Sequence, residues 1–160
     1  MRLRAAAVAV SLSLAAAAAF PAERGEAKGT FAGKAVSIDY GRPSLQGRDM
    51  LAQAKVGVPW RMGADSPTQL KTAAELTFAP GAVVPPGDYV LTATKTSPDK
   101  WQIDVKRASG DPIEIPLATR TLTAPVETFT IEISPEKEKG RGEIVLKWGT
   151  TALSAPFSAR

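Results

Sequence analysis

Histidine, cysteine and asparagine are absent from the chain of 160 residues. Without histidine and cysteine, the commonest ligands of transition metals are missing, and serine-histidine and cysteine-histidine nucleophilic pairs are excluded. Zinc would be left with carboxylates alone, and the acidic residues never cluster at the spacing of a calcium-binding loop. We therefore expect no metal and no cofactor. The missing asparagine also removes any N-glycosylation acceptor.

Positively charged residues only slightly outnumber negatively charged ones. The formal net charge of +4 includes Arg2 and Arg4, so the rest of the chain holds 18 basic against 16 acidic residues. These charges are interspersed rather than clustered. A balance of this kind does not predict nucleic-acid binding or attachment to a membrane surface.

Long hydrophobic runs are also scarce, and the one that exists lies at the start. Residues 1–4 are basic, residues 5–19 are apolar, and Ala17 and Ala19 form an A-x-A cleavage site, which is the pattern of a secretory signal peptide. The run is shorter than the roughly 20 residues that a membrane span needs, so we expect no membrane anchor. We predict a signal peptide over residues 1–22, cleaved after Ala19 or Ala22, and an exported protein that is periplasmic or extracellular.

From residue 34 onward the dominant pattern is an alternation of apolar and polar residues, which is typical of half-buried strands. Turn signals rich in proline, glycine and aspartate separate the segments, and Pro116 favours an edge position for its strand. We predict an all-β fold, an antiparallel β-sandwich of jelly-roll type, over residues 35–158. Residues 23–34 are expected to be a flexible N-terminal segment. The predicted strands are residues 36–40, 76–78, 89–94, 101–106, 113–117, 129–133, 144–148 and 153–157, with a turn at Gly149–Thr150 between the last two.

Helical periodicity is nearly absent after the signal peptide. The best candidate covers residues 44–55, where Met50, Leu51 and Ala54 could share one face, but Gly47 interrupts it. We expect at most one short helix.

One connection between predicted strands is unusually long. Residues 39–65 read DYGRPSLQGRDMLAQAKVGVPWRMGAD and contain three arginines, three aspartates, four glycines, two prolines and one tryptophan. Long connections in compact domains are uncommon unless they are functional or held by specific contacts. Arginine can supply such contacts, because its planar fork of donors pairs with carbonyls, carboxylates or a bound anion.

This segment is part of a wider resemblance of the chain to the bacterial family catalogued as domain of unknown function 2911. The resemblance rests on VSIDYGRPSLQGR, PWRMGAD, PPGDYVLTA, DKWQI and VETFTIEI followed by GEIVLKWGTT, and spans about residues 35–158. It implies an exported, β-rich protein and no particular reaction. Asp65 stands where the family pattern suggests an asparagine.

The candidate ligand-binding residues all lie in this segment. They are Tyr40, Arg42, Arg48, Trp60, Arg61 and Asp65. The arginines either form an electropositive pocket or only hold the connection through carbonyls and aspartates. Trp60 is either a core residue or a stacking platform, and the Tyr40 hydroxyl either satisfies the loop or faces a cleft.

Three classes of function follow from these alternatives. We expect a binding module for an anionic small molecule or a glycan, with an arginine and aromatic pocket, rather than an enzyme. The alternative is a structural or protein-interaction domain of the cell envelope. The second alternative is a sugar hydrolase or lyase that uses two carboxylates, for which Asp39, Asp65 and Asp88 are candidates. Oligomeric state is left open.

Overall fold

The computed structural model describes residues 21–160. The predicted signal peptide therefore lies, apart from its last two residues, outside the described residues. Within residues 21–160 every regular element is a strand, and residues 50–53 form turns where a short helix was allowed. No helix among these residues is long and apolar enough to cross a membrane. The strands are β1 (Glu23–Phe31), β2 (Lys34–Arg42), β3 (Pro59–Trp60), β4 (Thr68–Thr72), β5 (Leu76–Phe78), β6 (Ala82–Val84), β7 (Gly87–Ser97), β8 (Lys100–Lys106), β9 (Ile113–Pro135) and β10 (Arg141–Ala159).

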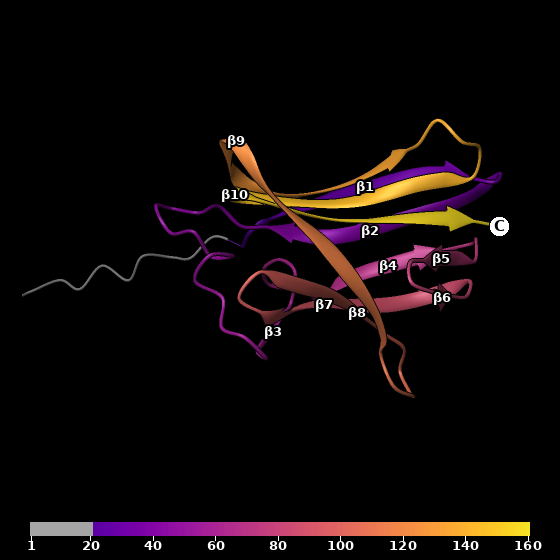
Figure 1. Ribbon diagram of the computed structural model, residues 1–160, viewed down its shortest axis with the longest axis horizontal. Coiled ribbons are helices and arrows are strands. Elements are labelled where there is room, and N and C mark those ends of the chain that lie inside the picture. The colour runs from indigo at the N-terminus through magenta and orange to yellow at the C-terminus, as the bar shows by residue number, and fades with distance from the viewer. Residues whose placement is uncertain (1–20) are drawn as a thin grey trace, which may run out of the picture.

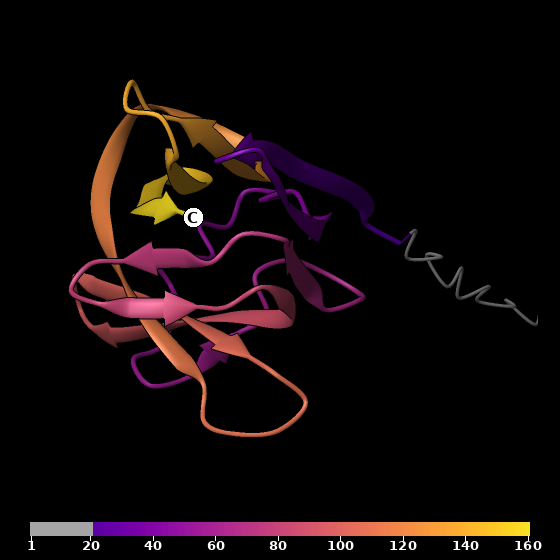
Figure 2. The same cartoon turned by 90° about the vertical axis from the view of Figure 1, so that its right-hand side faces the viewer.

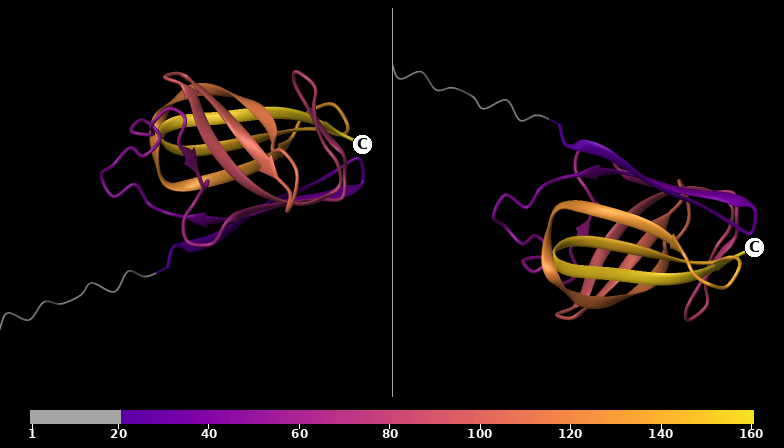
Figure 3. Two further views of the ribbon diagram at one scale, coloured as in Figure 1. Left: turned by 90° about the horizontal axis from the view of Figure 1, so that it is seen from below. Right: turned by 90° about the horizontal axis from the view of Figure 1, so that it is seen from above.

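The strands form a single antiparallel sheet (Figure 1). Its order is β1-β2-β4-β7-β8-β9-β10-β5-β6, and β3 pairs separately with β7. The sheet curls over on itself, as the end-on view in Figure 2 and the two views in Figure 3 show. β1, at one end of this order, packs against β9 and β10. The predicted all-β, antiparallel class is confirmed, and the sandwich and jelly-roll detail stays a prediction.

Two long strands carry the sheet from one layer to the other. β9 pairs with β8 through residues 113–117 and with β10 from Ala118 onward, and it crosses the molecule diagonally in Figure 1. The sequence predicted two strands in each of these segments, and the structure corrects this. Gly149, predicted as part of a turn, instead lies at a register shift within β10 with φ of 59°. A bulge of this kind bends a strand without ending it.

The structure also differs from the prediction at residues 23–34. This segment contains β1, which pairs along its whole length with β2. Alternation was missed because the inward-facing positions are small: Gly25, Ala27 and Gly29 precede the buried Phe31. A methyl group on Gly25 would lie 3.0 Å from the Tyr40 ring, so the small residues make room for large neighbours.

The core lies inside the curl and contains two groups of aromatic side chains. Near β3, Trp60 stacks on Trp148 with ring centroids 5.8 Å apart and meets Phe129 edge-on at 5.0 Å. Near β5, Phe157 packs against Phe31 at 4.9 Å and Phe78 at 5.6 Å. In Figure 1, β3 lies toward the left of the molecule and β5 toward the right.

Candidate functional site

The long connection between β2 and β4 is fixed to the sheet at its beginning. Ser44 forms an isolated bridge with Thr128 on β9. The amide of Phe129 donates to the carbonyl of Pro43, and the amide of Leu45 donates to that of Glu127, both at 2.9 Å. Residues 43–45, which directly follow β2, are thus hydrogen-bonded to residues 127–129 of β9. These bonds fix the direction in which the connection leaves the sheet.

Asp49 organises the next turn. One carboxylate oxygen accepts from the amide of Ala52 at 3.1 Å, and the other accepts from the hydroxyl of Thr150 at 3.3 Å. A methyl group on Gly149 would lie 3.0 Å from the Asp49 carboxyl carbon, so the bulge in β10 leaves room for this carboxylate. The turn is therefore anchored to β10 by the aspartate.

The second half of the connection returns through β3 to the core. The amide of Gly57 donates to the carbonyl of Lys95 at 2.8 Å, and β3 then pairs with β7. Met62 is fully buried with φ of 55°, and its carbonyl accepts from the hydroxyl of buried Thr68 at 2.7 Å. Residues other than glycine and asparagine seldom adopt such a φ, and here burial and this bond hold it.

The three predicted arginines have separate surroundings. Arg42 lies 3.8 Å from the Glu23 carboxylate, and its Nε is buried without a hydrogen-bond partner. Arg61 is exposed and donates to the carbonyl of Asp65 at 2.9 Å. Arg48 is exposed. Among residues 21–160, no ion pair joins these arginines to Asp39, Asp49 or Asp65.

The remaining candidates divide between core and surface. Tyr40 is buried, donates to the carbonyl of Ile131 at 3.3 Å and meets Phe129 edge-on. The exposed carboxylate of Asp65 accepts from the amide of Ala22 at 2.6 Å. Of the other two carboxylates considered for acid-base chemistry, Asp39 pairs with Arg24 and Asp88 is exposed. Arg61 and Asp65 are thus brought together, while Tyr40 faces the core.

Trp60 lines a recess within the long connection. The recess has a volume of about 220 Å³. Trp60 is half-buried, and the side chains around it include Met50 and Val58, which are 41% and 56% exposed. The full lining is Met50, Leu51, Gln53, Ala54, Lys55, Val58, Pro59 and Trp60. The predicted connection therefore holds a cavity, but its walls are apolar and its only charged group is Lys55.

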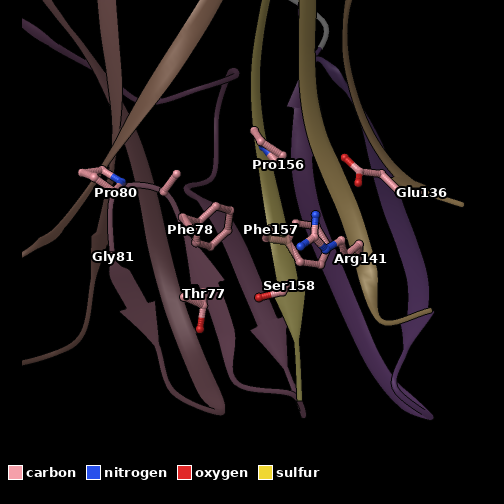
Figure 4. A pocket seen from close by; sticks show the side chains of 10 residues that line it. Thr77, Phe78, Pro80, Gly81, Glu136, Arg141, Pro156, Phe157 and Ser158 are labelled. Carbon is pink, nitrogen blue, oxygen red and sulfur yellow. The ribbon is translucent and has the colours of Figure 1, made fainter. Parts of the chain in front are cut away.

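A larger cavity lies near the other end of the sheet, beside β5 and β10 (Figure 4). Its volume is about 630 Å³, and Phe78 and Phe157, which pack against each other, lie in its wall. Its polar groups include Glu136, Arg141 and Ser158. Sequence reasoning missed this cavity because its lining comes from residues 77–81, 136–141 and 156–158, which are separated in the chain and form no motif.

Comparison with known families gives one match. The model of the family described as Protein of unknown function (DUF2911) matches residues 22–157. The chain belongs to this family. No curated protein and no solved structure matches the chain. DUF2911 membership assigns no activity.

Proposed function

We propose that this DUF2911 protein is an exported binding module for a small organic anion that carries an apolar or aromatic group. The observation that carries the proposal is the recess beside Trp60. The ligand's apolar part occupies the recess, and its negative charge lies near Lys55. The proposal keeps the predicted class of function and places the ligand on Trp60 rather than on three converging arginines.

The exposed apolar side chains support this choice of ligand. Met50 and Val58, which line the recess, are 41% and 56% exposed, and Val56, which lies between them in the chain but does not line it, is 52% exposed. Isolated exposed apolar residues are ordinary, but a group of them around a concave site is typical of binding sites. Covering these side chains with an apolar ligand would remove their surface from water, which stabilises a complex by about 25 cal/mol per Å².

Charge supports an anion. The lining of the recess contains Lys55 and no carboxylate. Among residues 21–160, no ion pair involves Lys55 or the nearby Arg48. The one acidic side chain of this turn, Asp49, is engaged with Ala52 and Thr150. An anionic group at the rim would therefore meet positive charge that no internal partner neutralises.

The experiment compares 4-phenylbutyrate with 4-phenylbutanol and with butyrate. Binding is measured by quenching of tryptophan fluorescence and by the rise in melting temperature that ligation produces. We expect 4-phenylbutyrate to bind most tightly, because it alone combines the ring and the charge. Equal affinity for all three compounds, or no binding by any, would overturn the proposal.

Variants locate the site. Val58→Asp should abolish binding, whereas Val83→Asp on β6 should not, since Val83 is also exposed but lies outside the recess. Lys55→Met should weaken the binding of 4-phenylbutyrate and leave the binding of 4-phenylbutanol unchanged. Lys100→Met, at another exposed lysine, is the matched control. Arg48→Gln and Arg61→Gln in the same titration test the predicted arginine contacts. Loss of binding in both Val58→Asp and Val83→Asp would contradict a site at Trp60.

A further inference from the structure

The cavity beside β5 continues into a second one. The second cavity has a volume of about 370 Å³ and is also lined by Phe78, Ala79, Pro80 and Pro156. Beyond these shared walls it reaches Pro116, Ala118 and Ser154. The two cavities therefore adjoin along these shared residues, and we call them together the groove.

The groove exists because β10 changes partners. β10 pairs with β9 as far as Ser154↔Ala118 and with β5 from Phe157↔Phe78. Pro156 lies between these two ladders and has no amide hydrogen to donate to either. The strands diverge at this fork, and the hollow between them is built into the topology of the sheet.

The groove combines an apolar floor with a polar rim. Ala79, Pro80 and Pro156 line it together with the buried Phe78 and Phe157, and Figure 4 shows Arg141 and Glu136 to the right of Phe78. The Nε of Arg141 pairs with Glu138 at 2.8 Å, which leaves its two terminal nitrogens as donors. On the lower side in Figure 4, Thr77 and Ser158 are paired across β5 and β10 and add two hydroxyl groups.

We propose that this groove binds a neutral oligosaccharide. A sugar ring offers an apolar C–H face and an edge of hydroxyl groups, which match the apolar walls and the rim respectively. Neighbouring hydroxyls can accept from the Arg141 nitrogens and donate to the Glu136 carboxylate. Because the charged groups of the lining are one arginine and one glutamate, a neutral ligand suits the rim better than an anion.

An extended peptide is the main competitor for such a groove, and the backbone disfavours it. A peptide that adds to a sheet edge needs amide donors and carbonyl acceptors along that edge. Pro80, Pro116 and Pro156 line the groove and supply no amide hydrogen. Recognition therefore depends on side chains, which suits a sugar.

This inference does not rest on the function proposed for the Trp60 recess. In Figure 1, β3, which carries Trp60, lies toward the left, and β5, which borders the groove, lies at the right. The two sites share no lining residue. Failure of one proposal leaves the other standing, because the probes and the variants differ.

The test uses residues 21–160 and a panel of maltohexaose, cellohexaose, xylohexaose and chitohexaose, with a proline-rich decapeptide as competitor. Calorimetry measures affinity, and melting curves check that each variant is folded. We expect at least one saccharide to bind, and Arg141→Met to weaken it by about tenfold or more, the loss of one charge-assisted hydrogen bond. Glu136→Gln should also weaken the binding of that saccharide.

Arg120→Met is the matched control, because Arg120 is exposed on β9 and lies outside both cavities. It should leave the affinity within about twofold of the unmodified chain, a difference below 0.5 kcal/mol on the scale of about 1.4 kcal/mol per tenfold. The proposal is overturned if no saccharide binds, if the peptide binds and the saccharides do not, or if Arg141→Met and Arg120→Met behave alike.

Discussion

Gly41 is the position where a single methyl group should disturb the long connection most. It lies near the end of β2, with the backbone of Gly63 and Ala64 packed directly against it. A methyl group there would lie 2.8 Å from the Ala64 nitrogen and closer still to the Ala64 carbonyl oxygen. Backbone atoms cannot rotate away as a flexible side chain can, so the segment that holds Met62 must move.

The expected cost of Gly41→Ala follows from this geometry. Inserting a methyl group into a packed site costs about 1–3 kcal/mol. The upper end applies because the clash is with backbone, and because displaced Met62 would lose part of the roughly 1.5–3 kcal/mol gained by burying such a side chain. We therefore expect a loss of about 3 kcal/mol in the free energy of unfolding.

Gly47→Ala is the control, since a methyl group there meets nothing within 4 Å, although φ is 77°. Its cost should be about 1 kcal/mol, from the positive φ alone. Urea unfolding followed by tryptophan fluorescence separates the two, because a slope of about 1–3 kcal/mol per molar turns 3 kcal/mol into a midpoint shift of about 1–3 M. Equal midpoints for the two variants, or a larger shift for Gly47→Ala, would refute the reasoning.

Two further substitutions test local features of the fold by the same unfolding assay. Ala32→Asn should stabilise the chain by about 0.5–1 kcal/mol, because Ala32 and Gly33 join β1 to β2 with φ of 50° and 76°, and asparagine tolerates this conformation better than alanine; a lower midpoint would contradict it. Thr68→Val should cost about 1–3 kcal/mol, because it leaves the buried Met62 carbonyl without its donor. Thr68→Ser keeps the hydroxyl and should recover most of that loss, which a purely steric role for the threonine would not allow.

The strands that alternate clearly were predictable, and those with small or hydroxylated inward residues were not. β7 and β8 bury Tyr89, Leu91, Trp101 and Ile103 at every second position, so their faces can be assigned from the sequence. β1 buries mainly small residues, and β4 buries Thr68 and Thr72 beside Leu70. Burial of such residues depends on which neighbours need the space, and a local pattern does not contain that information.

The candidate site shows the same division. The length and composition of residues 39–65 drew attention to the connection, and a recess with Trp60 in its lining lies there. The arginines do not line that recess, and Met50 and Val58 do. A long charged side chain has many rotamers of similar energy, so its direction is set by partners such as Glu23 for Arg42. Those partners are distant in the chain.

The order of residues was sufficient to specify an antiparallel all-β domain, because side-chain alternation along a strand is a local property of the extended backbone. Which strands become neighbours, where β10 exchanges β9 for β5, and how Phe78, Arg141 and Ser158 come to share one groove depend on contacts between residues far apart in the chain. Such contacts form only when the sheet curls and the core excludes water, so folding in three dimensions creates both proposed sites.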